Sequence, residues 1–180
     1  MKGNVFCYLW IWSCLVILGS QAIAQEQNSV FAPWDMSLLT GSLLPQNITG
    51  FHESLGIAGL RMGTSFETFR PELLVVGGNE LGQSYQGLWL SLRNQVDMVA
   101  GDGLLAFWYL GLQYTRYKLP SEDSIEYPFF HGSGPHFGFG AEMPISTHIS
   151  FRGDFYLGLG PGRILLMAFG LQYKFGELKE

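Results

Sequence analysis

The segment from Leu165 to Phe175 alternates between two kinds of side chain. One set of alternate positions is apolar or aromatic throughout: Leu165, Met167, Phe169, Leu171, Tyr173 and Phe175. The intervening positions turn small and polar and end with Gln172 and Lys174. A period of two residues is that of a β-strand, and about 9–11 such residues cross a membrane. The segment therefore predicts the last strand of a membrane β-barrel.

The same alternation recurs upstream. It predicts eight strands: Trp34–Leu44, Gly56–Ser65, Phe69–Val76, Ser84–Gln95, Leu104–Tyr117, Pro135–Ile145, Ile149–Leu159 and Leu165–Phe175. The first has the weakest pattern, because apolar residues occupy both faces and Gly41 interrupts them. Pro71 predicts a strand start or a bulge. The longest irregular stretch, Lys118–Ser133, contains an acidic cluster and two prolines.

These strands suggest an all-β fold: an eight-stranded antiparallel, up-and-down transmembrane barrel. Lipid can be spanned only by helices or closed barrels, and bacterial barrels have an even number of strands. An even number places both termini at one end. If that end is periplasmic, the periplasmic connections lie near 66–67, 97–102 and 144–148. The external ones then lie near 45–53, 78–83, 118–133 and 160–162, so the longest is outside, as expected.

The second face of each strand predicts a polar barrel interior. It collects Arg61, Arg70, Glu72, Arg93, Gln113, His136, Glu142, Arg152, Asp154, Gln172 and Lys174. An eight-stranded barrel is just wide enough to be filled by side chains, and buried charges require partners. A soluble lipocalin-type barrel would place its charges outside instead. The outward faces here carry almost no charge, which favours the membrane barrel.

Composition limits the alternatives. Charged residues make up 14% of the chain, aromatic residues 15%, and mean hydropathy is +0.16. Beyond residue 24 there is no run of eighteen apolar residues, which excludes a helical span. Composition alone would also allow a soluble β-sandwich or lipocalin-like barrel. The net charge of −5 and the lack of a basic patch exclude a nucleic-acid partner. The four histidines show no metal-ligand spacing, so we expect neither metal nor cofactor.

The N-terminus predicts a cleavable secretory signal peptide over residues 1–24. Lys2 is followed by the apolar segment Val5–Gly19, and Ala22-Ile23-Ala24 supplies the cleavage site. Both cysteines lie within this segment, so the mature chain has no disulfide. We expect a lead-in over 25–33, the barrel over 34–176 and a short tail over 177–180.

This strand pattern resembles the small bacterial outer-membrane barrels of the OmpA/OmpX type. The most specific part is Leu171-Gln172-Tyr173-Lys174-Phe175, similar to the C-terminal signal of such barrels, although Gly176–Glu180 follow it. The resemblance implies location in the outer membrane of a Gram-negative bacterium, with membrane lipid as a partner. It also implies recognition by the barrel-assembly machinery through Leu171, Tyr173 and Phe175.

A second resemblance concerns a possible active site. His131-Gly132-Ser133 and Glu142 resemble the His-x-Ser and Glu of lipid A 3-O-deacylases, in which His would activate Ser and Glu would orient His. Three features depart from that family. Gly134 replaces the usual Asn, Glu142 follows sooner than expected, and its parity is inward whereas His131 and Ser133 have outward parity. We therefore expect His131 and Ser133 to end an external loop.

The resulting expectation is a non-enzymatic outer-membrane barrel with a structural or surface-interaction role. The external loop 118–133 would be its contact element, with an unknown partner. Two alternatives remain open at this point. One is the deacylase-like esterase, and the other is passage of small apolar molecules through a lateral opening near Pro71 or Pro135.

Overall fold

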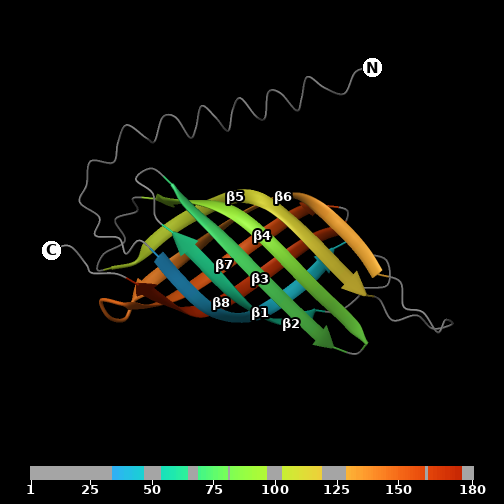
Figure 1. The fold of residues 1–180 in the computed structure, drawn as a ribbon, viewed down its shortest axis with the longest axis horizontal. Coiled ribbons are helices and arrows are strands. Elements are labelled where there is room, and N and C mark those ends of the chain that lie inside the picture. The colour runs from blue at the N-terminus through green and yellow to red at the C-terminus, as the bar shows by residue number, and fades with distance from the viewer. Residues whose placement is uncertain are drawn as a thin grey trace, which may run out of the picture. The chain divides into compact units, whose positions relative to one another are not determined.

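The computed structural model describes residues 34–46, 54–64, 69–80, 82–96, 103–118, 129–160 and 162–175, without the side chains of 129 and 162. These residues form eight strands: β1 (Trp34–Gln46), β2 (Leu55–Thr64), β3 (Arg70–Glu80), β4 (Gln83–Val96), β5 (Leu105–Lys118), β6 (Phe129–Pro144), β7 (Ile149–Gly160) and β8 (Gly162–Phe175). Each strand pairs with its sequence neighbours in one closed antiparallel barrel (Figure 1). The predicted fold class is confirmed. The predicted signal peptide, lead-in and tail lie outside the described residues.

Strand β8 closes the barrel. It pairs with β7 on one side and with β1 on the other, from Trp34 opposite Phe175 to Gln46 opposite Arg163. This long register gives β1 a partner along its whole length, although its own alternation is weak. Pairing with β8 therefore carries β1 past Leu44, the predicted end, to Gln46.

Two predicted turn regions belong instead to strands. Residues 118–133 were expected to be irregular because they include an acidic cluster and two prolines, but β6 begins at Phe129 and pairs with β5 throughout. Strand β3 likewise continues through two glycines to Glu80. Its connection to β4 is therefore short, and Gly82 within it has a φ of 79°, which favours glycine. In both places, pairing with a neighbour overrides local turn propensity.

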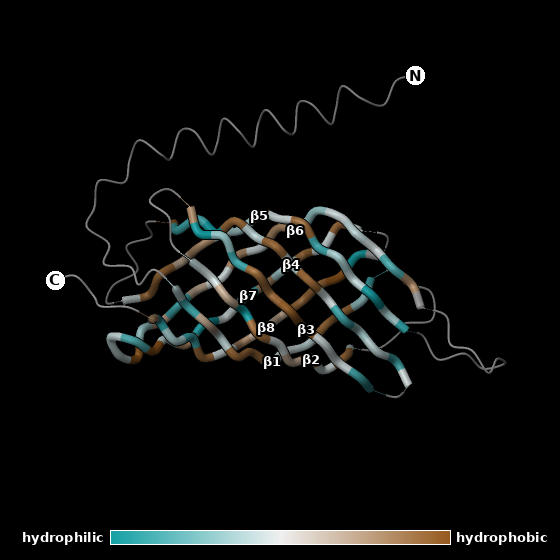
Figure 2. The backbone as a smooth tube through the Cα atoms, viewed as in Figure 1, coloured by the Kyte–Doolittle hydropathy of each residue, from teal (hydrophilic) through white to brown (hydrophobic). Residues whose placement is uncertain are grey.

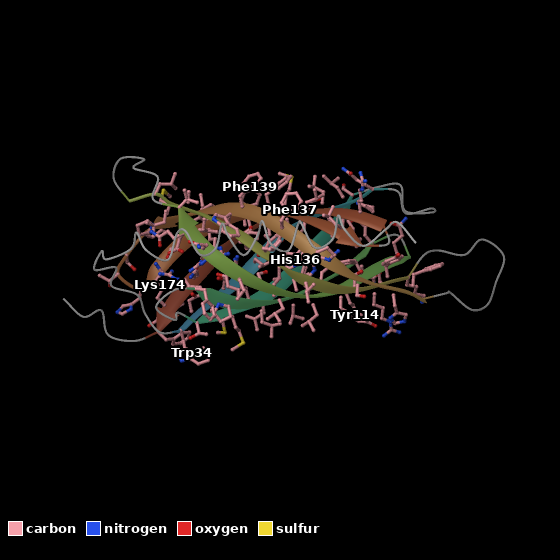
Figure 3. All side chains as sticks on the ribbon, turned by 90° about the horizontal axis from the view of Figure 1, so that it is seen from above. Trp34, Tyr114, His136, Phe137, Phe139 and Lys174 are labelled. Atoms are coloured by element: carbon pink, nitrogen blue, oxygen red, sulfur yellow. The ribbon has the colours of Figure 1, made fainter. Side chains whose placement is uncertain are left out.

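The alternation in sequence corresponds to two faces of the barrel wall. Leu38, Leu112 and Phe139 are outward and 70%, 65% and 59% exposed, whereas their alternate neighbours are largely buried. Figure 3 shows Phe137 and Phe139 pointing away from the barrel and His136 within it. In Figure 2, apolar stretches occupy the middle of the strands and hydrophilic stretches lie toward the barrel ends.

Inward-facing glycines make room for the large interior side chains. A Cβ on Gly87 would lie 2.6 Å from both the Trp89 Nε1 and the Tyr85 hydroxyl. A Cβ on Gly140 would lie 2.5 Å from the Phe107 ring. The narrow barrel therefore accommodates aromatic side chains only because parts of its inner wall carry no side chain.

Candidate functional site

The barrel interior contains a cluster of charged side chains near the end that carries the described termini. Its members are Asp35, Arg61, Glu72, Arg93, Glu142, Arg152, Asp154 and Lys174. Four are basic and four are acidic, so the cluster is formally neutral. Apart from Lys174, all are at most 7% exposed. We call this set the interior charge cluster.

Arg152 is the centre of the interior charge cluster. Its two terminal nitrogens donate to the two Glu72 carboxylate oxygens at 2.7 and 2.8 Å, a bidentate arrangement. Its Nε donates to Asp154 at 2.9 Å, and Asp154 also accepts from Arg61 at 2.5 Å. These contacts join β2, β3 and β7 across the lumen.

A second set of ion pairs extends from Glu72 toward the end of the barrel where Trp34 and Phe175 lie. The Arg93 guanidinium lies 3.0 Å from Glu72, 3.7 Å from Glu142 and 3.9 Å from Asp35. Glu142 accepts a hydrogen bond from the Ser150 hydroxyl at 2.8 Å and forms an ion pair with Lys174. Every charged group in the cluster therefore has an oppositely charged partner, as burial requires.

An aromatic layer lies next to the interior charge cluster. Arg152 and Arg93 stand over the Phe107 ring, at 4.3 and 5.0 Å from its centroid. The Tyr109 ring stacks on Tyr156 at 4.4 Å, and its hydroxyl donates to the Phe139 carbonyl at 2.9 Å. These rings fill the middle of the lumen and pack directly against the guanidinium groups.

The other half of the interior is apolar and aromatic. Its buried side chains include Leu43, Leu55, Ile57, Val76, Tyr85, Trp89, Ile164 and Leu166. The residues predicted for the interior were all polar or charged, although the predicted alternation already placed Trp89 and Leu166 on the inward face. Inward apolar residues are recognisable only once strand parity is known, because they look the same as outward ones.

The remaining predicted interior residues lie as follows. Gln113, His136 and Gln172 are buried, and the His136 ring Nε2 lies 2.8 Å from the Ser91 hydroxyl. Arg70 is half-buried at the start of β3. Asp35 was not among the predicted interior residues, because the mixed pattern of β1 left its parity unassigned. Ser91 and Ser150, two short polar residues on faces predicted to be inward, were also missing from the predicted set.

The structure does not bring the three candidate catalytic residues together. His131 and Ser133 are exposed on the outer face of β6, where the His131 Nδ1 lies 2.5 Å from the Tyr114 hydroxyl. Glu142 lies near the other end of the same strand and faces inward to Lys174 and Ser150. The expectation that His131 and Ser133 end a loop was wrong, since both lie within β6. No bulge reverses their parity, because β5 and β6 pair without interruption.

The described residues contain no group of three or more His, Cys, Asp or Glu side chains arranged to hold a metal ion. They also contain no helix with the length and hydropathy needed to cross a membrane.

Comparison with solved structures identifies the class of fold. Neisserial surface protein A has a TM-score of 0.66 at 9% identity, covering 80% of this chain and 98% of that protein. The N-terminal barrel of OprF from Pseudomonas aeruginosa has 0.58 at 13% identity, covering 78% and 97%. Ail, the attachment invasion locus protein of Yersinia pestis, has 0.55 at 8% identity, covering 79% and 96%.

The chain thus has the fold of small eight-stranded outer-membrane barrels, and the predicted resemblance to that class is confirmed. Comparison with models of known protein families gives no match, and neither does comparison with the sequences of curated proteins.

Proposed function

We propose that this protein is a non-enzymatic, non-conducting barrel of the bacterial outer membrane with a structural or surface-interaction role. The observation that carries the proposal is the opposite character of its two faces. Exposed apolar side chains surround the wall, while the interior charge cluster is neutralised inside it. In water the exposed apolar surface would be an aggregation hazard, whereas in lipid it is the stable arrangement.

The filled lumen supports a non-conducting barrel. The interior charge cluster occupies one end, the Phe107–Tyr109–Tyr156 ring layer the middle, and apolar side chains the other end. Trp89, Tyr109 and Arg152 are each 0% exposed. An aqueous path would require moving several of these side chains together and breaking buried ion pairs.

The two alternative functions receive less support. A deacylase-like esterase would need His131, Ser133 and Glu142 to converge, and they lie on opposite faces of β6. Lateral passage would need an opening in the wall near Pro71 or Pro135. Pairing with β4 and β5 continues across Pro71 and Pro135, and pairing with β2 and β7 begins at the residue that follows each proline.

Reconstitution of the mature chain tests the proposal. We expect folding only in detergent or lipid, with faster gel mobility before heating than after. In liposomes we expect ion and small-solute permeability equal to that of empty liposomes. A freely soluble monomer would contradict the membrane assignment, and steady conductance would contradict the closed lumen. An unchanged lipid A mass spectrum on overexpression, for both wild type and Ser133→Ala, is the result expected of a non-enzymatic barrel.

For the surface role, we propose the connection between β5 and β6 as the contact element. Strand β6 begins at Phe129, which reduces the predicted loop 118–133 to residues 119–128, a segment that carries Glu122, Asp123 and Glu126. Two proteins of similar fold are named a surface protein and an attachment invasion locus protein. Replacing 119–128 by a short glycine-containing turn should abolish binding to host cells or surface ligands and leave heat-modifiable mobility intact. Unchanged binding would contradict this role.

A further inference from the structure

A polar groove lies on the barrel wall at the end opposite Trp34 and Phe175. It has a volume of about 550 Å³ and runs across β3, β4 and β5. Its polar lining consists of Asn79, Ser84, Gln86, Arg116 and Lys118. We call it the rim groove. Among the described residues, its lining thus combines two basic side chains with three neutral hydrogen-bonding side chains.

Strand register makes the rim groove a continuous surface. Gln86 is opposite Gly77 on β3 and opposite Arg116 on β5. One step farther along, Ser84 is opposite Asn79 and Lys118 in the same way. These residues share the outward parity of their strands, so two cations and three polar side chains converge from adjacent strands on the outer wall.

The rim groove adjoins the apolar wall. On β4 the outward positions change from Leu88 to Gln86, and on β5 from Leu112 and Tyr114 to Arg116. Tyr114 marks this boundary, because its exposed side chain lies between Leu112 and Arg116 on the outer face of β5 and its hydroxyl bonds to His131. Tyrosine occupies this position at a membrane–water interface, where lipid headgroups begin.

We propose that the rim groove binds the phosphate-bearing headgroup of a membrane lipid. The inference rests on the proposed membrane location. A guanidinium and an ammonium side by side suit a phosphate, since Arg can bind it bidentately and Lys adds charge. Neutral donors from Asn79, Ser84 and Gln86 can hydrogen-bond the remaining oxygens or sugar hydroxyls. The acyl chains would then lie along the apolar wall next to the groove.

The test uses the folded mature chain in a maltoside detergent, which contains no phosphate. Short-chain phosphatidic acid, the matched diacylglycerol and inorganic phosphate are titrated separately, and bound ligand is counted by native mass spectrometry. We expect retention of phosphatidic acid only. The double variant R116Q/K118Q should bind it about thirtyfold more weakly, since basic groups at a membrane surface each contribute severalfold.

Two further variants sharpen the test. R163Q removes one exposed charge at the same end of the barrel but outside the groove, and it should bind within about twofold of wild type. Gly77→Leu fills the groove and keeps both cations. A Cβ there would meet only the Tyr85 carbonyl, at 3.5 Å, so the variant should fold yet lose most of the binding.

The outcomes separate this inference from the proposed function. Equal binding of diacylglycerol, or of inorganic phosphate alone, would overturn the assignment to a lipid phosphate. Wild-type affinity in R116Q/K118Q or Gly77→Leu would overturn the assignment to the rim groove. Absence of phosphatidic acid binding by a barrel with heat-modifiable mobility would overturn the inference alone, whereas failure to fold in detergent would overturn the proposed function.

Discussion

A single buried guanidinium connects much of the barrel interior. Arg152 pairs with Glu72 and Asp154 and also covers the Phe107 ring. Such a group is costly to bury and contributes to stability only while its partners remain in place. Removing it leaves carboxylates in a lumen that holds no equivalent replacement for its bidentate contact. The interior charge cluster should therefore respond sharply to loss of this one side chain.

We expect Arg152→Met to lower the free energy of unfolding by about 3–5 kcal/mol, because Glu72 and Asp154 each lose a charged partner. Urea-induced unfolding of the barrel in lipid vesicles, followed by tryptophan fluorescence, measures the change. Arg163→Met removes an exposed arginine from β8 and should change stability by less than about 0.5 kcal/mol. Equal effects of the two substitutions would show that the charge cluster contributes nothing specific.

An interior residue could be predicted from the sequence only where the alternation of its strand showed which face points inward. Arg61, Arg93 and Arg152 stand out in sequence because each interrupts an otherwise apolar strand, so alternation alone placed them inward. Asp35 was not found, because β1 is apolar on both faces and its parity is fixed by pairing with β8. Which carboxylate pairs with which arginine depends on barrel shear, which no local pattern encodes.

At the scale of a strand, β4 shows the two faces most clearly. Its outward Leu88, Leu90 and Leu92 are 46%, 55% and 46% exposed, while the alternate Trp89 and Ser91 are buried. The strand can occupy lipid because it pairs with both neighbours along most of its length, leaving few free backbone groups on the wall.

We expect Leu90→Lys to destabilise the barrel in lipid vesicles by about 2–4 kcal/mol, the cost of a basic residue near the bilayer midplane. Gln86→Lys, two outward positions nearer the rim on the same strand, should cost no more than about 1 kcal/mol. Urea unfolding in vesicles gives both values. If the two variants were equally stable, the wall of β4 would not face hydrocarbon.

Strand existence was predictable, and strand ends were less so. All eight strands were expected, and six of them differ from the predicted ranges by at most three residues at either end. The main errors lie at Gly77–Glu80, where glycines suggest a turn, and at Phe129–Gly134, most of which fell in the predicted irregular stretch. In both places the neighbouring strand supplies a paired partner. Turn propensity is local, whereas the pairing that overrides it comes from residues elsewhere in the chain.

At the scale of the whole molecule, closure brings the first and last strands together. Trp34 and Phe175 are opposite one another in the β1–β8 register, although they are the ends of the described barrel. Trp34 and Lys174 accordingly lie at the same end in Figure 3. The barrel is therefore a closed ring of strand pairs. We call each pairing between neighbouring strands a seam; the β1–β8 seam is the one whose strands are not consecutive in the chain.

A circular permutant separates the stability of this ring from its recognition during assembly. The chain would begin at Gly103, run to Phe175, cross a flexible linker of about five residues to Trp34, and end at Val96. Because every strand pair is kept, we expect refolding in detergent with the heat-modifiable mobility of the parent. Its C-terminal strand no longer carries Leu171, Tyr173 and Phe175, so assembly into the outer membrane in cells should fall severalfold. Failure to refold would show that the β4–β5 connection cannot be exchanged for a β8–β1 connection. Assembly in cells as efficient as that of the parent chain would contradict recognition through Leu171, Tyr173 and Phe175.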